Sequence, residues 1–454
     1  MKTPNIVLIV VDTLRFDYFN SNVFPKAFQH LSKDSELYEN VITPASWTVP
    51  SHASIFSKQY PSVHNIHKMK GLNDIEMLDY VRKENGFKSF VEKLRTNGYL
   101  TLGYSANPFI SSSSIFASGF DLFLDSEFQR LLSISLKDKI EDLIIPGKDL
   151  DILQKLQIGG RLIRRYLKNS NSEEEKKFDL RKDKGAKVFT ELINGMSINQ
   201  PFFLFVNLME MHEPYIRSEY GHLLNKSKWS DYFGYKKFSN SERSEIKRIY
   251  LQNASLIDYT ILEVLKFLIH SKIYDDTMLI ITSDHGQAFW ECGFYSHESF
   301  LYEEIIRVPL LIKYPMNEKR DLRKYENKNF TTIDLGDLIQ SRANGLREFL
   351  NPREIVFSES YGFNILSLPK IRMSKEHKQN VISASLPRKA IYKDDFKLVV
   401  NAKMEIECLS KKHVKVDHNS FKSICKELLD DIDIFSSGDQ FFVESKTPEW
   451  LDDR

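Results

Sequence analysis

The sequence predicts an α/β protein with a large, mixed and mostly parallel sheet sandwiched by helices. Two observations indicate this fold. Continuous apolar runs rich in β-branched and aromatic residues occupy 5–12, 202–208 and 277–284, as expected of strands that are covered on both faces. Amphipathic segments at 87–99 and 244–271 alternate with these runs. This alternation is the βαβ rhythm of a parallel sheet with helices on both sides.

The C-terminal part has a different character, which predicts a small α+β subdomain. Residues 388–403 alternate like an antiparallel hairpin, and 420–435 read either as a helix or as a pair of strands. A chain of 454 residues with 42% hydrophobic content can bury a large core. We therefore expect a catalytic domain at 1–384 and a C-terminal subdomain at 385–454.

Two segments interrupt the rhythm of the main domain. Residues 126–185 are rich in Lys, Glu, Asp and Leu, which predicts a helical insertion with a solvated loop. Residues 216–243 are polar and aromatic without a clear period and are expected to form a variable loop. Segments of this length form either substrate walls or surface decoration, and the sequence leaves both roles open.

Charge and cysteine content exclude several functional classes. Lys and Arg number 63 against 62 Asp and Glu, so no field of the whole protein favours nucleic acid or an anionic membrane. The three cysteines are odd in number and widely spaced, which predicts reduced thiols. The apolar run before Asp12 is too short for a signal sequence or a membrane span. We therefore expect a cytoplasmic protein that has no membrane span and does not bind nucleic acid.

Acidic residues follow two of the predicted strands. Asp12 ends the first strand, where open α/β sheets gather their ligands, although a carboxylate there could equally cap the next helix. The run TSDHG places Asp284, His285 and Gly286 at the end of another strand. Adjacent Asp and His supply an oxygen and an imidazole ligand to the same point, and glycine permits a tight turn. We expect Asp12, Asp284 and His285 to fix one divalent cation.

Thr48, in the stretch ASWTVPSHASIF, has two readings. A threonine before an apolar helical run usually caps the helix, because its oxygen accepts from the free amides of the first turn. If three metal ligands converge nearby, the hydroxyl can complete the site instead. A hydroxyl on a divalent metal at a helix N-terminus loses its proton readily and becomes a nucleophile. We expect Thr48 to be both ligand and nucleophile, with the cap as a second role.

The chain resembles the sulfatase branch of the alkaline phosphatase superfamily in the order and spacing of six motifs. These are PNIVLIVVDTLR, SWTVPSHASIFSKQYP, LMEMHEPY, TSDHG, HESFLYEEIIRVPLLI and AIYKDDFKLV. The resemblance covers nearly the whole chain. It implies a metal-dependent hydrolase of sulfate, phosphate or phosphonate esters. The site residues that it implies are the metal ligands Asp12, Asp284 and His285, the ligand and nucleophile Thr48, and the anion-binding catalytic histidines His212 and His297.

The chain departs from the sulfatase pattern at the nucleophile. Sulfatases carry a C/S-x-P-x-R signature whose first residue becomes formylglycine, whereas this chain has Thr48-Val49-Pro50-Ser51-His52. A threonine cannot undergo that conversion, so the nucleophile is expected to be an unmodified hydroxyl.

A second departure concerns the metal. Thr13 stands where many sulfatases have a further Asp, and the site is completed by His285, so Mn²⁺ or Zn²⁺ is favoured relative to Ca²⁺. The two-zinc members need a His four residues after an Asp, but Asp258 here is followed by Leu262. We expect one divalent ion.

Further candidates surround these residues. His52 lies one helical turn after Thr48 and is expected either to orient the nucleophile or to touch the substrate. Asn107 resembles an asparagine that approaches the anion in related enzymes. Arg15 and Asp17 are expected to form a local salt bridge that supports the metal loop. Glu359, at another strand end, is expected to orient its neighbours.

The substrate is expected to be a small anionic ester or a glycan. The resemblance leaves the substrate anion and the acceptor open. Water or a sugar hydroxyl could release the group held by Thr48, which gives a hydrolase or a transferase that modifies a glycan. The altered signature also keeps a third class open, an inactive sulfatase-like binding module.

Overall fold

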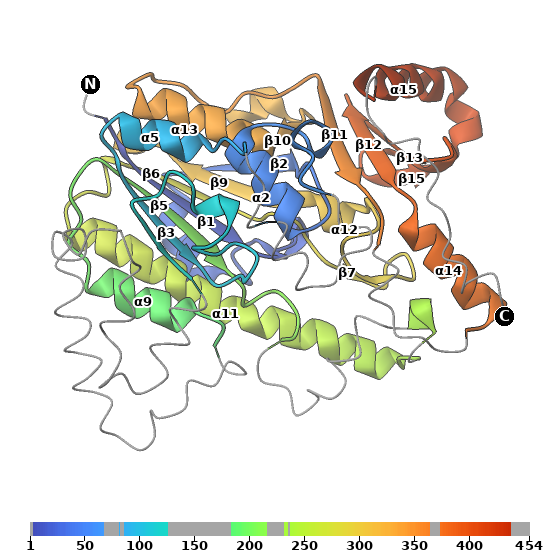
Figure 1. Cartoon of the computed structure of the whole chain (residues 1–454), viewed down its shortest axis with the longest axis horizontal. Coiled ribbons are helices and arrows are strands. Elements are labelled where there is room, and N and C mark those ends of the chain that lie inside the picture. Colours follow the sequence, from blue (N-terminus) through green and yellow to red (C-terminus); the bar gives the residue numbers. More distant parts are fainter. Residues whose placement is uncertain are drawn as a thin grey trace.

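The computed structural model describes residues 3–67, 81, 86–125, 183–215, 231–234, 237–363 and 373–436. These residues form a mixed eight-stranded sheet with helices on both faces and an antiparallel five-stranded sheet near the C-terminus, as Figure 1 shows. This architecture confirms the predicted fold class.

The strands of the large sheet are β1 (Asn5–Val11), β2 (Glu36–Ile42), β3 (Leu100–Ser105), β4 (Leu122–Leu124), β5 (Phe202–Leu208), β6 (Thr277–Thr282), β9 (Arg307–Lys313) and β10 (Phe330–Thr331). A small hairpin consists of β7 (Ala288–Phe289) and β8 (Tyr295–Ser296). The five-stranded sheet contains β11 (Ile355–Ser360), β12 (Arg388–Lys393), β13 (Phe396–Asn401), β14 (Ile406–Lys411) and β15 (Val414–Val416).

The α-helices of the described residues are α1 (Pro25–Leu31), α2 (Thr48–Ser57), α3 (Pro61–His64), α5 (Phe90–Thr96), α9 (Ala186–Asn194), α11 (Asn240–His270), α12 (Glu303–Ile306), α13 (Leu335–Ala343), α14 (Lys375–Ser385) and α15 (Lys422–Phe435).

The strand order of the large sheet is β10-β2-β9-β6-β1-β5-β3-β4. β1 pairs in parallel with both β5 and β6, whereas β9 runs antiparallel to its neighbours β6 and β2. The three apolar runs of the sequence are therefore the three central strands, and they lie side by side. Their carboxyl ends meet at one edge of the sheet.

Both faces of the large sheet are buried. In β1, Val7 and Ile9 pack into the cluster formed with α1, α9 and α11, while Ile6 and Leu8 pack into the cluster on the other face. Figure 1 shows α2, α5 and α13 covering that second face. Because every residue of β1 is buried, the residues after Asn5 form a continuous apolar run instead of an alternating one.

The long helix α11 begins four residues before its predicted start. Ser239 accepts a hydrogen bond from the backbone amide of Glu242, and the Glu242 carboxylate accepts one from the Ser239 amide. This capping box stabilises the first turn, so polar residues that the sequence assigned to a variable loop belong to the helix.

The C-terminal sheet begins earlier in the chain than residue 385, because β11 pairs with β12. β12 and β13 form the antiparallel hairpin that was predicted at 388–403, and the segment 420–435 resolves as the helix α15. One face of the sheet packs on α15 through residues such as Leu398 and Leu428, and the other packs on the main domain through residues such as Tyr392 and Ile305. The division of the chain into 1–384 and 385–454 stays a prediction.

Most of the two predicted insertions lies outside the described residues, namely 126–182 and 216–230. Of the second, residues 231–233 form a short 3-10 helix, and residues 240–243 belong to the first turn of α11. The three cysteines Cys292, Cys408 and Cys425 form no disulfide, as predicted.

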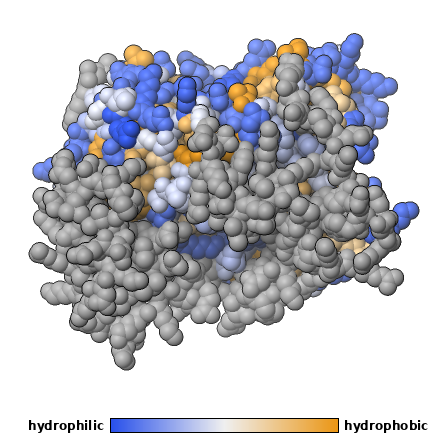
Figure 2. Space-filling model, viewed as in Figure 1, coloured by the Kyte–Doolittle hydropathy of each residue, from blue (hydrophilic) through white to orange (hydrophobic). Residues whose placement is uncertain are grey.

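Surface and helix composition agree with a globular domain. Hydrophilic residues cover most of the coloured surface in Figure 2, with hydrophobic residues in small groups. No helix in the described ranges combines the length and apolar character that crossing a membrane requires.

Candidate active site

The site lies where β1 and β6 end. These adjacent parallel strands deliver Asp12 and the pair Asp284-His285 to the same edge of the sheet. All three side chains are fully buried. The strand ends therefore bring together residues that are more than 270 positions apart in the chain.

Three acceptor atoms face one another at this point. The Nε2 atom of His285 lies 3.7 Å from Oδ1 of Asp12 and 3.5 Å from Oδ2 of Asp284. The Nδ1 atom of His285 lies 2.9 Å from the Gly286 carbonyl oxygen, which can only accept, so Nδ1 carries the proton and Nε2 presents its lone pair. Neither carboxylate oxygen has a hydrogen-bond partner among the described residues. Two oxygens and an imidazole nitrogen that face one another in this way fit a divalent cation.

The protonation of these groups reflects their burial. Burial and the nearby charge of Asp284 raise the pKa of Asp12 to about 7. Burial likewise raises the pKa of Asp284 to about 7 and lowers that of His285. A bound cation reverses this effect, because it favours the charged carboxylates and the unprotonated imidazole.

Thr48 is the first residue of α2, and its hydroxyl points into the cluster. The Oγ1 atom lies 3.3 Å from Oδ2 of Asp12 and 3.3 Å from Nε2 of His285. Trp47 occupies the N-cap position, and no side chain caps the helix. The second role predicted for Thr48, as a helix cap, is therefore wrong. A residue at the first helical position directs its side chain away from the amides that a cap would satisfy.

The loop that carries Asp12 is held by its neighbours. Thr13 has a positive φ of 60°, and its amide donates to Oδ1 of Asp284 at 3.4 Å. The Tyr250 hydroxyl donates to the Thr13 carbonyl at 2.9 Å and accepts from the Arg15 amide at 3.1 Å. The backbone of Thr13 thus helps to hold the loop that carries Asp12.

Gly286 closes the opposite side of the site. A Cβ atom at this position would lie 2.1 Å from the carbonyl oxygen of Glu304. The backbone of α12 can therefore lie this close to the TSDHG turn because Gly286 has no side chain.

The two predicted anion-binding histidines lie beside His285. The ring of His297 is centred 4.4 Å from that of His285, and the ring of His212 is centred 5.2 Å from that of His297. Nδ1 of His297 donates to Oε1 of Gln287 at 2.8 Å, and Nδ1 of His212 contacts the Glu213 carbonyl oxygen. The ring of His297 thus lies close to those of both His285 and His212.

His52 and Asn107 contact the site residues themselves. His52 is fully buried, and its Nδ1 donates to the Thr48 carbonyl at 2.9 Å; burial lowers its pKa to about 4, so the ring is neutral near pH 7. The Nδ2 atom of Asn107 donates to Oδ2 of Asp12 at 2.9 Å. The substrate contacts proposed for both residues stay predictions. Their observed contacts orient Thr48 and Asp12.

Two other candidates support the surrounding structure. Arg15 pairs with Asp17 at 2.7 Å, which confirms the predicted salt bridge, and it also pairs with Glu291 at 2.6 Å. Glu359 accepts from the Ser62 amide at 2.9 Å and lies 3.3 Å from the ammonium of Lys389.

Asp258, the residue that stands where two-zinc relatives begin a second site, has a structural partner. Its carboxylate accepts from the amides of Lys26 at 3.1 Å and Ala27 at 2.8 Å. These amides open α1, so Asp258 caps that helix from a distance in the sequence.

Two residues of the site escaped the sequence interpretation. Gln287 orients His297, and its position directly after TSDHG was a usable signal. Lys184 donates to the His212 carbonyl, and its charge acts on Asp12. Burial lowers the pKa of Lys184 to about 8. Lys184 lies in a run of alternating charges that resembles a solvated surface, so no pattern could have marked it.

Sequence comparison places the chain among known proteins. The sulfatase family model matches residues 4–343. A choline-sulfatase of Rhizobium meliloti (strain 1021) is 22% identical over 343 residues, which cover 69% of this chain and 63% of that protein. The extracellular sulfatase SULF-1 homolog of Drosophila melanogaster is 25% identical over 332 residues, which cover 69% of this chain and 28% of that protein. The chain thus spans less than two thirds of either relative.

Solved structures share the fold over nearly the whole chain. The phosphonate monoester hydrolase of Agrobacterium radiobacter superposes with a TM-score of 0.63 at 14% identity and covers 98% of both chains. A protein solved in complex with its substrate D-glucosamine-2-N,6-O-disulfate superposes with a TM-score of 0.59 at 15% identity, covering 98% of this chain and all of that one.

Proposed function

The chain belongs to the sulfatase family, and we propose that it is a metal-dependent hydrolase of sulfate, phosphate or phosphonate esters with Thr48 as the nucleophile. One observation carries the proposal. The Thr48 hydroxyl lies 3.3 Å from both Asp12 and His285, at the centre of a buried set of metal-ligating groups.

One divalent ion would be held by Asp12, Asp284, His285 and the hydroxyl of Thr48. When bound, such an ion neutralises the two carboxylates and lowers the pKa of a hydroxyl beside it. Mixed oxygen and imidazole donors favour Mn²⁺ or Zn²⁺ over Ca²⁺.

The residues of the chain account for the remaining chemistry. The Thr48 Oγ1 atom attacks the sulfur or phosphorus atom, and its proton passes toward the Asp12 carboxylate that it already faces. A bond from Thr48 Oγ1 to the central atom forms, the bond to the leaving oxygen breaks, and the departing alcohol takes a proton from Nε2 of His297 in its imidazolium form. Water then attacks the central atom of the threonyl ester and gives a proton back to His297. The bond to Thr48 Oγ1 breaks, Thr48 regains the proton that Asp12 holds, and the sulfate, phosphate or phosphonate is released.

His297, His212 and Lys184 provide the positive side of the site. Gln287 orients His297 through Nδ1, which leaves Nε2 of His297 available to the ester oxygens, and the ring of His212 lies next to that of His297. Lys184 places a cation on the backbone of His212. Hydrogen-bond donors and charges fixed in advance stabilise the oxygens of the transition state without reorganisation.

A transferase that modifies a glycan is the second candidate. A threonyl ester must be released by an attacking hydroxyl, and a sugar alcohol can replace water in that step. Structural neighbours solved with a disulfated glucosamine or with k-i-k-neocarrahexaose bind sugars, which supports a small anionic ester or glycan as substrate. An inactive binding module is the third candidate, and a cytoplasmic location stays a prediction.

The test uses the full-length protein loaded with Mn²⁺ or Zn²⁺. Aryl sulfate, phosphate monoester, phosphodiester and phosphonate substrates are compared between wild type, Thr48→Ala and the matched surface variant Thr96→Ala. We expect Thr48→Ala to lose activity at least roughly a thousandfold and Thr96→Ala to keep it. Mass spectrometry of a quenched reaction should find the transferred group on the peptide that carries Thr48.

Two outcomes would contradict the proposal. Equal rates in wild type and Thr48→Ala would remove Thr48 from the mechanism. A metal-loaded wild type that hydrolyses none of the substrates, with or without sugar acceptors, would favour the binding module.

A further inference from the structure

The histidine loop, residues 296–299, presents His297 to the active site in a backbone conformation that side chains disfavour. It begins at the end of β8, and Ser296 and Glu298, on either side of His297, have φ angles of 107° and 83°. Neither of these two residues is a glycine, so both positive φ angles are strained. Strain of this kind persists only where the surrounding structure holds it in place. The position of His297 therefore depends on the contacts of the histidine loop.

Hydrogen bonds hold the backbone of Glu298 on both sides. Its amide donates to the Ser46 carbonyl oxygen at 3.0 Å. Its carbonyl oxygen accepts from the hydroxyl of Ser46 and, at 2.7 Å, from the hydroxyl of Ser360. The Ser360 hydroxyl also lies 3.0 Å from the Ser299 carbonyl oxygen. Both serine side chains are buried, so these bonds are shielded from competing water.

The two serines belong to distant parts of the chain that meet beside the nucleophile. Ser46 lies two residues before Thr48, in the segment between β2 and α2. Ser360 is the last residue of β11, in the C-terminal sheet. Beside it, the Glu359 amide donates to the Pro44 carbonyl oxygen at 2.8 Å. The end of β11 therefore contacts both the segment that leads to the nucleophile and the histidine loop.

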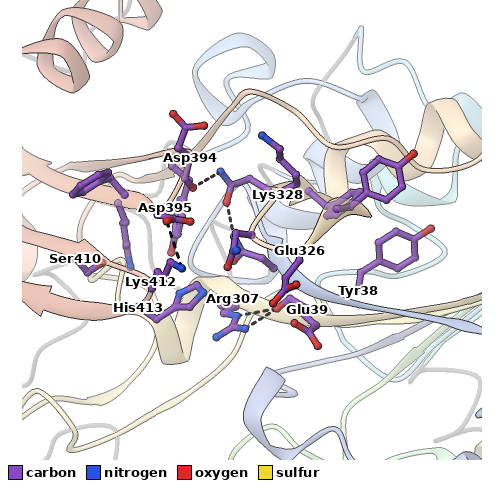
Figure 3. Close-up of a pocket in the computed structure, with 18 of the residues that line it drawn as sticks. Tyr38, Glu39, Arg307, Glu326, Lys328, Asp394, Asp395, Ser410, Lys412 and His413 are labelled. Carbon is purple, nitrogen blue, oxygen red and sulfur yellow. Dashed lines mark hydrogen bonds and ion pairs between the residues drawn. The ribbon is translucent and has the colours of Figure 1, made fainter. Parts of the chain in front are cut away.

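Another part of the C-terminal sheet lies away from this junction and supplies a control residue. A cavity of about 470 Å³ lies between the turn after β12 and β14 on one side and β2 and the start of β9 on the other, as Figure 3 shows. Ser410 of β14 lies in the cavity wall and is 4% exposed, and its hydroxyl makes no hydrogen bond with the part of the chain that the structure describes. Neither Ser360 nor the histidine loop lines this cavity. Ser410 is therefore a buried serine of the same sheet that does not hold the histidine loop.

We propose that Ser360 is a positioning residue, which holds the histidine loop from the C-terminal sheet and so sets the position of His297 relative to Thr48. The inference rests on the proposed function, in which His297 gives a proton to the leaving alcohol. A general acid must lie within hydrogen-bond reach of the oxygen that it protonates. Without the Ser360 hydroxyl, the histidine loop can relax from its strained conformation and carry the imidazole out of that reach.

The variant Ser360→Ala should keep the fold. The Glu298 carbonyl oxygen retains the hydrogen bond from Ser46, and the Ser299 carbonyl oxygen retains the guanidinium of Arg388 at 3.4 Å. The substitution removes one oxygen atom and adds no bulk. A change in the rate should therefore report the position of the loop, and thermal unfolding of the variant checks that the fold is intact.

The test compares full-length wild type, Ser360→Ala and Ser410→Ala, each loaded with Mn²⁺ or Zn²⁺. The substrates are the phenyl and 4-nitrophenyl esters of the anion that the wild type hydrolyses fastest. Phenol is a poorer leaving group than 4-nitrophenol, so its departure needs the general acid more. His297→Ala is measured alone and combined with Ser360→Ala. Hydrogen exchange of the Glu298 amide is followed in the wild type and both serine variants.

We expect Ser360→Ala to lower kcat about tenfold for the phenyl ester and about twofold for the 4-nitrophenyl ester, with little change in KM. Ser410→Ala should behave like wild type. Adding Ser360→Ala to His297→Ala should not lower kcat further, because the side chain that Ser360 positions is already absent. Exchange of the Glu298 amide should become faster in Ser360→Ala and stay unchanged in Ser410→Ala.

Several results would overturn the proposal. Equal losses for the two esters, or a further loss when Ser360→Ala is added to His297→Ala, would indicate a general structural effect. Unchanged kinetics or unchanged exchange of the Glu298 amide in Ser360→Ala would show that Ser360 does not hold the loop. A wild type that hydrolyses neither ester would instead overturn the proposed function, and the exchange measurement would then test the hold of Ser360 on the loop by itself.

Discussion

Removing the divalent metal should make the stability of this protein fall as the pH rises from 5 to 7.5. In the metal-free chain, burial raises the pKa values of Asp12 and Asp284 from 3.8 to about 7, and the charge of Asp284 adds to the rise for Asp12. The folded state therefore holds more protons than the unfolded state between these values. A raised carboxyl pKa contributes stability that is fully present below the unfolded pKa and is lost as the pH passes through the folded pKa.

The magnitude follows from the same values. A change from 3.8 to about 7 corresponds to about 4 kcal/mol for one carboxyl group, at about 1.4 kcal/mol for each pKa unit. The two groups titrate as a pair, so we assign this cost to the pair and not to each residue. A bound cation removes the penalty. The stabilisation that the metal confers should therefore increase with pH by several kcal/mol.

Urea denaturation at pH 5, 6, 7 and 7.5, with a chelator or with Mn²⁺, measures this difference. Other buried groups, such as Glu210, titrate in both samples and cancel in the comparison. In Asp284→Asn the effect of the metal should disappear, whereas Asp430→Asn, an exposed change on α15, should behave like wild type. A metal effect that is independent of pH, or that shrinks as the pH rises, would refute the buried-carboxylate argument.

Three further changes test buried contacts of the site and of the structure around it. Tyr250→Phe leaves two buried backbone groups of the Asp12 loop without a partner, which should cost about 1–3 kcal/mol for each group in urea denaturation; a loss below about 0.5 kcal/mol would contradict this role. Lys389→Met removes the ammonium that offsets the buried charge of Glu359 and should cost about 3–5 kcal/mol, and adding Glu359→Gln should restore part of the stability. Burial raises the pKa of Glu303, but the Lys397 charge and a facing histidine outweigh it and hold that pKa well below its usual range. The advantage of wild type over Glu303→Gln in thermal unfolding should therefore be present above pH 4.5 and shrink as the pH falls toward 3, and a constant difference would argue against the ion pair.

The sequence predicted those strands and helices whose pattern of apolar and polar residues reflects how they are buried. Residues 6–11 are apolar at every position because β1 is buried on both faces. An acid that ends such a strand lies at the carboxyl edge of the sheet, so Asp12, Asp284 and His285 could be placed together from the sequence. The motifs also placed the chain in its family, which the match over residues 4–343 confirms.

Local pattern could not decide contacts that depend on tertiary packing. The N-terminus of α2 is an example. The backbone angles decide that Trp47 is the N-cap residue and Thr48 the first helical residue, and the sequence does not reveal these angles. The hydrogen bond from Asn107 to Asp12 joins residues 95 positions apart, and no periodicity encodes that distance.

The sequence by itself thus determined the strands, the acids at their ends and the family, because buried strands and tight turns require recognisable patterns of residues. Only the tertiary structure decided where Thr48 points, which residues orient it, and how the C-terminal sheet packs on the main domain. These features arise from the packing of elements against one another, and a single side chain can make such a contact without changing the pattern around it.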